Sequence, residues 1–154
     1  MIFEPLRAHP QHLDTLAAWH FAEWHSLYPD HSLDDFARDL QDSMGVDFIP
    51  GTWVLLDGEQ LVGSASILHQ DMTANTDLSP WLANVYIAAK YRGRGLGQYL
   101  VRALMKKAAQ AGLQNLYLFT EDRASFYHKL GWQVIRQHSY NQAEVRIMTT
   151  DLQP

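Results

Sequence analysis

The chain has 154 residues, of which 47% are hydrophobic and 19% charged, and its formal net charge is −5 at pH 7. This length and composition are typical of a single globular domain over residues 1–154, with no apolar run near the roughly 20 residues that a membrane span needs. The acidic balance argues against nucleic acid as a general partner, and the absence of cysteine excludes disulfides and thiolate metal sites.

Two segments of the chain differ in charge. Residues 23–47 hold seven carboxylates and one arginine, whereas residues 90–107 hold six basic side chains and no acidic one. This polarity favours an anionic ligand at the basic segment and a cationic partner at the acidic one, unless the acidic side chains belong to solvated helix faces.

The N-terminal segment, MIFEPLRAHPQ, has no basic start followed by a long apolar stretch. We therefore expect no secretory signal and a cytoplasmic location.

The first third of the chain predicts a short strand and two helices. IFEPLRA is typical of a strand, and apolar residues recur at helical spacing from Gln11 to about His25. Ser32 is placed as the N-cap of a second helix, whose apolar residues also recur at helical spacing.

The central part predicts three strands and a longer helix. Residues 52–71 are typical of a β-hairpin that turns at Asp57–Gly58. WLANVYIA (81–88) follows as a strand, and a helix over 96–111 comes next, ended by Gly112. Regular alternation in the strand places Leu82, Asn84 and Tyr86 on one face and Ala83, Val85 and Ile87 on the other.

The last part predicts a strand over 113–120, a short helix over 122–131 and a final strand pair over 132–140 and 143–150. The full order is β–α–α–β–β–β–α–β–α–β–β, with a parallel crossover from strand 81–88 through the long helix. We therefore expect an α/β (mixed α+β) fold with one central mixed sheet of about seven strands and about four helices. The ligand crevice is expected beyond the end of strand 81–88.

The turn between that strand and the long helix, YRGRGLGQYL (91–100), is the most informative motif. Its alternate glycines Gly93, Gly95 and Gly97 allow close backbone approach to a ligand, and a helix N-terminus at the same place attracts anions. The NTPase pattern GxxxxGK[ST] is absent, and the dinucleotide pattern G-x-G-x-x-G fails where Gln98 stands. The motif predicts a phosphorylated ligand, and both familiar nucleotide loops fit it badly.

The stretch VYIAAKYRGRGLGQYLVRALMKKAAQAG resembles the acyl-coenzyme A-binding segment of the GNAT superfamily of N-acetyltransferases. The family motif [RQ]-x-x-G-x-[GA] is matched by Arg92, Gly95 and Gly97. LQNLYLFTEDRASFYHKLGWQVI resembles the family's next strand, short helix and FY-x-x-x-G-[FW] signature, so the resemblance covers essentially the whole chain. It implies a GNAT-like fold, acetyl-coenzyme A as co-substrate and acetyl transfer to an amine.

The resemblance also implies where the co-substrate binds. Backbone groups of the strand before the turn would pair with the pantetheine arm, and N–H groups of the turn would hold the pyrophosphate, with charge added by the arginines. The residues so implied are Val85, Tyr86, Ile87, Arg92, Gly93, Arg94, Gly95, Leu96, Gly97 and Gln98. A tight strand-to-helix turn without a ligand is the alternative interpretation.

Tyr127 matches the tyrosine of the FY signature, which implies a general acid that protonates the departing coenzyme A sulfur. A phenol is protonated at neutral pH and starts in the required state. The alternative is that it only packs the short helix onto the sheet. The chain departs from the family where Thr120 and Arg123 replace the common Asn and Ala, so a contact from Thr120 to the pantetheine arm would depend on its hydroxyl.

The general base is less well defined by the sequence. Asp71 and His69 lie just after the third predicted strand at the expected acceptor end, and either could take a proton through water. Asn84 stands where some relatives carry an acid, and an amide cannot be a base. We assign the role to Asp71, with release of the proton to bulk water as the alternative.

The acceptor site implied by the family lies along the first two helices and the following loop, where the acidic segment falls. Acidic and aromatic side chains suit a cationic amine of a small molecule or a peptide. The candidate acceptor-binding residues are Trp24, Tyr28, His69, Trp81 and Asn84. The alternative functions are a non-catalytic acyl-coenzyme A sensor and a nucleotide-binding module. The sequence does not decide whether the protein is a monomer or a homodimer.

The eight histidines do not predict a metal site. His9 and His12 form an H-x-x-H pair, but neither this pair nor the other histidines are accompanied by a carboxylate at a familiar metal spacing. We expect solvated or packing histidines and no metal.

Overall fold

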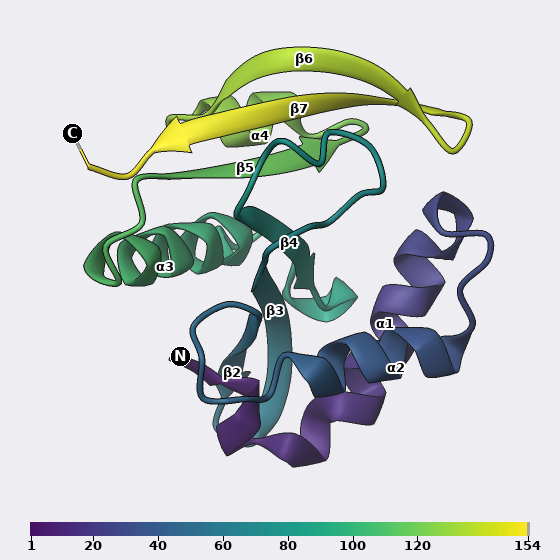
Figure 1. The fold of residues 1–154 in the computed structure, drawn as a ribbon. Helices are drawn as coiled ribbons and strands as arrows, with labels where there is room; N and C mark the ends of the chain where they lie inside the picture. The colour runs from purple at the N-terminus through teal and green to yellow at the C-terminus, as the bar shows by residue number, and fades with distance from the viewer. Residues whose placement is uncertain (154) are drawn as a thin grey trace.

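In residues 1–153, which the computed structural model describes, seven strands form one mixed sheet in the order β1-β2-β3-β4-β5-β7-β6 and four α-helices surround it (Figure 1). The strands are β1 (Ile2–Pro5), β2 (Gly51–Asp57), β3 (Gln60–Leu68), β4 (Trp81–Ile87), β5 (Asn115–Thr120), β6 (Gln133–Tyr140) and β7 (Ala143–Asp151). The helices are α1 (Leu13–Trp24), α2 (Leu33–Asp42), α3 (Leu96–Gln110) and α4 (Ala124–His128). The predicted element order and fold class are confirmed.

The sheet has a weak junction at its middle. On one side of the junction, antiparallel pairing joins β1, β2, β3 and β4 in sequence order. On the other side, antiparallel pairing joins β5 to β7 and β7 to β6. Among the described residues, β4 and β5 run parallel and pair at a single position, Trp81 with Tyr117, before they diverge (Figure 1). The predicted parallel crossover is confirmed, and the divergence leaves the later part of β4 without a neighbour on that side.

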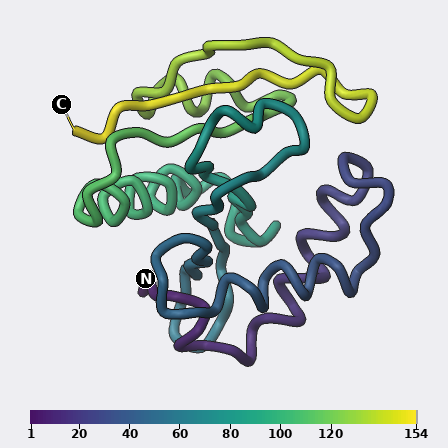
Figure 2. The backbone as a smooth tube through the Cα atoms, viewed as in Figure 1, coloured from purple at the N-terminus to yellow at the C-terminus, as the bar shows by residue number. Residues whose placement is uncertain are grey.

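Both faces of the sheet are covered. α3 lies on one face, where its apolar stripe, including Leu100 and Leu104, is fully buried. α1 and α2 cover the opposite face of the β1–β3 half through Leu16 and Leu40. On that same face the β3–β4 loop (69–80) packs against the β5–β7 half, and its path is visible in Figure 2. Within residues 1–153, none of the helices has both the length and the apolar character needed to cross a membrane.

Local sequence explains where the helices begin. Ser32 caps α2 as predicted: its Oγ accepts from the Asp35 N–H at 3.2 Å, and the Asp35 carboxylate accepts from the Ser32 N–H at 2.8 Å. This reciprocal capping box satisfies two otherwise unpaired donors. α3 begins after Gly95, whose backbone is left-handed with φ of 75°. The glycine lets the chain turn directly from β4 into the helix.

A β-bulge interrupts β4 at Asn84. The residue has φ of 55°, in the left-handed region that few non-glycine residues adopt. The register with β3 shifts at this point, because Ser66 pairs with Ala83 while Ser64 pairs with Tyr86. β4 therefore holds one residue more than β3 between these pairs.

The bulge changes which side chains of β4 share a face. Val85 and Ile87 pack toward the α3 core together with Leu82, and Tyr86 turns to α1, where its ring lies 5.4 Å from that of Trp19. The regular alternation predicted from the sequence is therefore wrong beyond the bulge. Because β4 has one extra residue here, each side chain after Asn84 lies on the face opposite to the one that strict alternation gives.

Candidate active site

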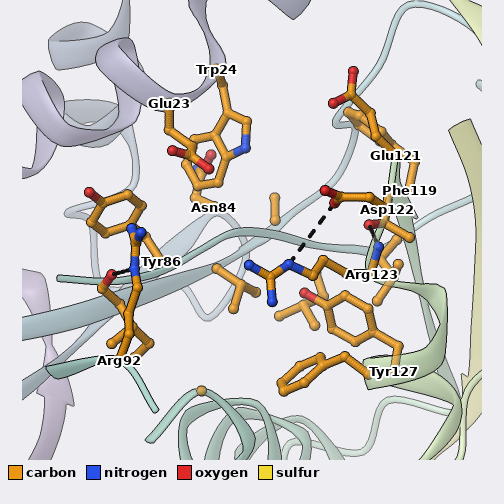
Figure 3. A pocket seen from close by; sticks show the side chains of 18 of the residues that line it. Glu23, Trp24, Asn84, Tyr86, Arg92, Phe119, Glu121, Asp122, Arg123 and Tyr127 are labelled. Atoms are coloured by element: carbon orange, nitrogen blue, oxygen red, sulfur yellow. Dashed lines mark hydrogen bonds and ion pairs between the residues drawn. The ribbon is translucent and has the colours of Figure 1, made fainter. Parts of the chain in front are cut away.

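A cavity of about 480 Å³ opens where β4 and β5 diverge. Its walls are the end of β4, the glycine turn with the start of α3, the end of β5 with α4, and the last turn of α1 with the residues after it (Figure 3). This is the crevice expected beyond strand 81–88. The predicted site residues on its walls are Trp24, Tyr28, Asp71, Asn84, Val85, Tyr86, Ile87, Arg92, Gly93, Gly95, Leu96, Gly97, Gln98, Thr120 and Tyr127.

The glycine turn forms an open cradle at one end of the cavity. Gly93 and Gly95 have φ angles of 79° and 75°, which favour glycine, and a Cβ on either would meet no atom within 4 Å. Within the described residues, no backbone N–H from Gly93 to Gln98 donates a hydrogen bond. Free N–H groups at the positive end of a 15-residue helix suit a diphosphate.

The two arginines of this turn take different positions. Arg92 lines the cavity: its Nε donates to the Ile87 carbonyl at 2.8 Å, and its guanidinium lies 5.3 Å from the Tyr86 ring (Figure 3). Arg94 lies outside the cavity wall, 5.6 Å from the Tyr91 ring. Of the two predicted arginines, Arg92 is the one that the fold places in the wall.

The bulge at Asn84 is held by two chains of buried hydrogen bonds. In the first, Ser64 Oγ donates to the Asn84 carbonyl at 3.2 Å and lies 2.9 Å from His20 Nε2. Because the Ser64 proton is engaged, His20 must donate to it from Nε2. The His20 ring is buried, and burial lowers its pKa to about 3, so the imidazole is neutral.

The second chain holds the side chain of Asn84. Its Nδ2 donates to Ser66 Oγ at 3.2 Å, and Ser66, Thr52 and Ser43 continue the chain at 2.8 and 2.7 Å. Ser43 Oγ donates to the Leu40 carbonyl at 2.6 Å, which fixes one donor direction along the whole chain. Both chains together hold a strained residue in place through its carbonyl and its amide.

Tyr127 lies on the opposite wall with its hydroxyl directed into the cavity (Figure 3). The residue is 8% exposed, and its ring packs edge-on against Phe126 and Trp132 at centroid distances of 5.0 and 6.0 Å. Burial raises the pKa of the phenol above its usual value, and the nearby charge of Arg123 lowers it in part. The phenol is therefore neutral across the physiological range.

Thr120 and Arg123 are joined in the turn that leads into α4. The Thr120 hydroxyl accepts the backbone N–H of Arg123 at 3.0 Å. The hydroxyl proton of Thr120 is not used in that bond and can be donated into the cavity. The Arg123 guanidinium extends over the cavity beside Tyr127, with its Nε 4.0 Å from the Asp122 carboxylate (Figure 3).

Asp71 and Tyr28 meet at the other end of the cavity. Tyr28 donates its hydroxyl proton to the Asp71 backbone carbonyl at 3.0 Å. Burial raises the pKa of the half-buried Asp71 carboxyl to about 8, and the Asp39 carboxylate also raises it. Burial likewise raises the pKa of the Tyr28 phenol above its usual value. A carboxyl with a pKa near the working pH is suited to exchange protons.

Three predicted site residues lie outside the cavity wall: Arg94, His69 and Trp81. His69 is exposed on the loop after β3. Trp81 is fully buried, and its indole N–H donates to the Leu78 carbonyl at 2.7 Å. The tryptophan packs at the β4–β5 junction, so its role is to anchor that junction.

The cavity wall contains three carboxylates that sequence reasoning did not single out, Glu23, Glu121 and Asp122. Glu23 belonged to the acidic segment noted above, but nothing in that segment distinguished it from its neighbours. Glu121 and Asp122 directly follow β5, and their position at the carboxyl end of a strand beside the crevice was the available signal. No group of three or more His, Asp or Glu side chains in residues 1–153 is arranged to hold a metal ion.

Comparison with protein families gives a match to the acetyltransferase (GNAT) family over residues 13–132. Among curated proteins, N-alpha-acetyltransferase 30 of Schizosaccharomyces pombe is 33% identical over 85 residues. That match covers 53% of this chain and 56% of the yeast protein, so the chain spans little more than half the length of this relative.

Several solved structures share the fold over nearly the whole chain. An aminoglycoside 6'-N-acetyltransferase complexed with coenzyme A has a TM-score of 0.80 at 19% identity, covering 100% of this chain and 98% of that one. An aminoglycoside 6'-acetyltransferase type Ii has a TM-score of 0.76 at 22% identity, with coverage of 100% and 99%. A putative N-acetyltransferase from Lactobacillus plantarum gives 0.69 at 21%, with coverage of 98% and 96%.

Proposed function

Because the chain belongs to the GNAT family of acetyltransferases, we propose that it transfers an acetyl group from acetyl-coenzyme A to a primary amine of a small molecule or a peptide. The observation that carries the proposal is the cavity, in which a cradle of free N–H groups, an unpaired strand edge and a buried phenol meet. Residues 1–154 act as one acetyltransferase domain. The family match and the structural matches over the whole chain support this extent.

The co-substrate has a defined place in this proposal. The diphosphate binds the N–H groups of Gly93–Gln98, with the Arg92 side chain beside it. The pantetheine arm pairs with backbone groups of Val85–Ile87, on the edge of β4 that β5 leaves unpaired. Thr120 donates its hydroxyl proton from the facing wall.

The proposed reaction is a direct transfer. Asp71 accepts a proton from the acceptor ammonium, directly or through one water, because only the neutral amine can attack. The amine nitrogen bonds to the acetyl carbon, and a backbone N–H of the Val85–Tyr86 segment donates to the carbonyl oxygen as negative charge develops there. The C–S bond breaks, its electron pair leaves with the sulfur, and the Tyr127 hydroxyl donates to that sulfur. The nitrogen, now bonded to the acetyl carbon, loses its second proton to water and becomes the neutral amide.

The acceptor is a cationic amine in this proposal. The acceptor end of the cavity combines the carboxylates of Glu23 and Asp71 with the aromatic rings of Trp24 and Tyr28. This lining attracts a positive charge and offers cation–π contact, with the side-chain amide of Asn84 nearby. The acceptors named for the relatives, aminoglycosides and protein α-amino groups, are primary amines and support this class.

Two measurements test the proposed function. Coenzyme A should raise the melting temperature in a concentration-dependent way, whereas ATP and NAD should not, because ligand binding to the folded state stabilises it. Thiol release from acetyl-coenzyme A is then followed across polyamines, amino acids, aminoglycosides and short peptides. Stabilisation without turnover on any amine would instead indicate a non-catalytic acyl-coenzyme A sensor.

The role of Tyr127 is tested by Tyr127→Phe. We expect kcat to fall by about 100-fold, as for the loss of one hydrogen-bond donor to a developing anion, while the melting temperature shift with coenzyme A is kept. The matched control is Tyr117→Phe, which removes a phenol that bonds Asn115 and lies outside the cavity wall. Equal kcat values for the two variants would contradict the assignment.

A further inference from the structure

The charge of the cavity wall opposes one step of the proposed reaction. The groups that carry charge in the wall at pH 7 are Glu23 on α1, Arg92 after β4, and Glu121, Asp122 and Arg123 between β5 and α4, whereas Asp71 in the β3–β4 loop is mostly neutral. Carboxylates outnumber cations in this set, which suits a cationic acceptor. The same carboxylates disfavour an anionic leaving group, because like charges close together raise the free energy of the anion.

One of the two cations in the wall is already engaged. Arg92 donates from Nε to the Ile87 carbonyl at 2.8 Å, and its guanidinium lies over the Tyr86 ring. It stands on the glycine-turn side of the cavity, across from Tyr127 (Figure 3). Of the cations in the described wall, Arg123 is therefore the one available to an anion that forms beside Tyr127.

The position of Arg123 suits that task. Arg123 precedes α4 and lies one helical turn before Tyr127, whose backbone N–H donates to the Arg123 carbonyl at 3.1 Å. The side chains of both residues line the cavity. Both enter the cavity, with the guanidinium beside the phenol hydroxyl (Figure 3).

Arg123 is held only weakly in the free protein. The side chain is 70% exposed, and its ion pair spans 4.0 Å to an Asp122 carboxylate that is 83% exposed. Exposed pairs of this kind contribute little, because water screens them. Little free energy is therefore lost when the guanidinium exchanges Asp122 for another anion.

Stability of α4 does not explain an arginine at this position. Arg123 is the N-cap of the helix and makes no side-chain capping bond. Helix N-termini favour Ser, Thr, Asp or Asn as caps and negative rather than positive charge nearby. The residue type opposes both preferences, so capping of α4 gives no reason for an arginine at this position.

We propose that Arg123 is a catalytic residue that stabilises the coenzyme A thiolate when the thioester is cleaved, in partnership with the Tyr127 hydroxyl. The proposal rests on the acetyl transfer described above. Asp71 takes the first proton of the ammonium, the amine nitrogen forms the bond to the acetyl carbon, the C–S electron pair stays on sulfur, and the second proton of the nitrogen goes to water. The sulfur anion is paired with the guanidinium and receives a hydrogen bond from the phenol, and it takes its proton from solvent afterwards.

The chemistry of the phenol explains why it needs this partner. A coenzyme A thiol titrates near about 8.5 and a free phenol near about 10, so full proton transfer from phenol to thiolate is already uphill. Burial raises the pKa of Tyr127 further, and the positive charge of Arg123 lowers it. The phenol alone can donate a hydrogen bond, and the cation supplies the charge that the leaving sulfur requires.

The proposal is tested on coenzyme A bound to the protein, without turnover. The thiolate of bound coenzyme A is titrated by its ultraviolet absorbance between pH 6 and 10 in the wild type, Arg123→Ala, Arg123→Lys and the control Arg7→Ala. Arg7 is exposed on the turn after β1, outside the cavity wall. We expect the thiol pKa in Arg123→Ala to lie about 1 unit above that in the wild type, with Arg123→Lys between them and Arg7→Ala unchanged.

Binding gives an independent readout. Because a stabilised thiolate binds more tightly, the affinity for coenzyme A relative to acetyl-coenzyme A should rise with pH in the wild type and stay nearly flat in Arg123→Ala. Equal thiol pKa values in Arg123→Ala and Arg7→Ala would overturn the role of Arg123 and leave the acetyltransferase proposal standing. A wild-type protein that fails to bind coenzyme A would overturn the proposed function itself.

Discussion

At the scale of single residues, Asp71 is a carboxyl in the cavity wall, at the end where we propose that the acceptor amine binds. Its raised pKa of about 8 means that it is mostly neutral at pH 7 and becomes a base as the pH rises. Below that pKa the fraction of base falls about tenfold per pH unit. We therefore expect kcat/KM to rise with pH and to level off above about pH 8, and Asp71→Asn to lose this limb. The measurement is the pH–rate profile of both proteins with one acceptor.

The same group affects stability with a definite sign. An acid whose pKa is raised in the folded state favours folding in its neutral form, so this contribution is present below the unfolded pKa and lost as the pH rises through about 8. The melting temperature of Asp71→Asn minus that of the wild type should therefore increase as the pH rises from 5 to 9. A difference in melting temperature that stays constant with pH would contradict the raised pKa of Asp71. Parallel pH–rate profiles would contradict its role as the base.

The sequence predicts some of these residues well and others poorly, for physical reasons. Tyr127 and the glycines sit in short motifs whose spacing is set within one turn, so local pattern is sufficient. His69 and Trp81 were placed by proximity along the chain, but exposure and burial depend on what packs against them. Trp81 meets the Leu78 carbonyl and the β5 aromatic rings, contacts that only the folded sheet creates.

At the scale of elements, β4 depends on side chains that are distant in sequence. Its existence and direction follow from its apolar pattern, but the bulge at Asn84 does not. The left-handed backbone there is held by Ser64 and Ser66 of β3, and through Ser66 by Thr52 of β2 and Ser43 beyond α2. The alternation rule assumes an uninterrupted strand and so cannot detect an inserted residue.

Ser66→Ala tests whether this hydroxyl chain positions the strand. The change leaves the Asn84 amide without its acceptor, and we expect the free energy of unfolding to fall by about 1–3 kcal/mol. Misplaced N–H groups in Val85–Ile87 should also lower kcat by about tenfold at saturating acetyl-coenzyme A, as measured by steady-state kinetics. Thr150→Val is the matched control, since its buried hydroxyl bonds the Gly131 carbonyl away from the cavity wall. Similar kinetics in both variants would mean that Ser66 contributes only to stability.

At the scale of the whole molecule, the protein consists of two half-sheets joined by covering helices and by one strand pair, Trp81 with Tyr117. The order of elements predicts this architecture because a strand–helix–strand crossover can form a parallel pair in few ways. The width of the divergence was not predictable, since it depends on the bulge and on the packing of the β3–β4 loop.

Binding of coenzyme A should change the rate of backbone hydrogen exchange in some strands and leave it unchanged in others. We expect hydrogen exchange to slow in residues 85–87 and 93–98 and at the end of β5, where backbone N–H groups gain partners or are shielded. Strand β1, which lies at the edge of the sheet and contributes no residue to the cavity wall, should exchange at an unchanged rate. Uniform slowing over all strands would indicate general stabilisation and would contradict a ligand seated between β4 and β5.

The single pair between β4 and β5 has an evolutionary consequence. A variant in which these strands paired along their whole length would gain several ladder hydrogen bonds and a more stable sheet. It would also fill the space that the thioester occupies in the proposed function. If the proposed function is correct, selection for stability alone would close the sheet and abolish turnover, and the divergence is a place where stability is given up for activity.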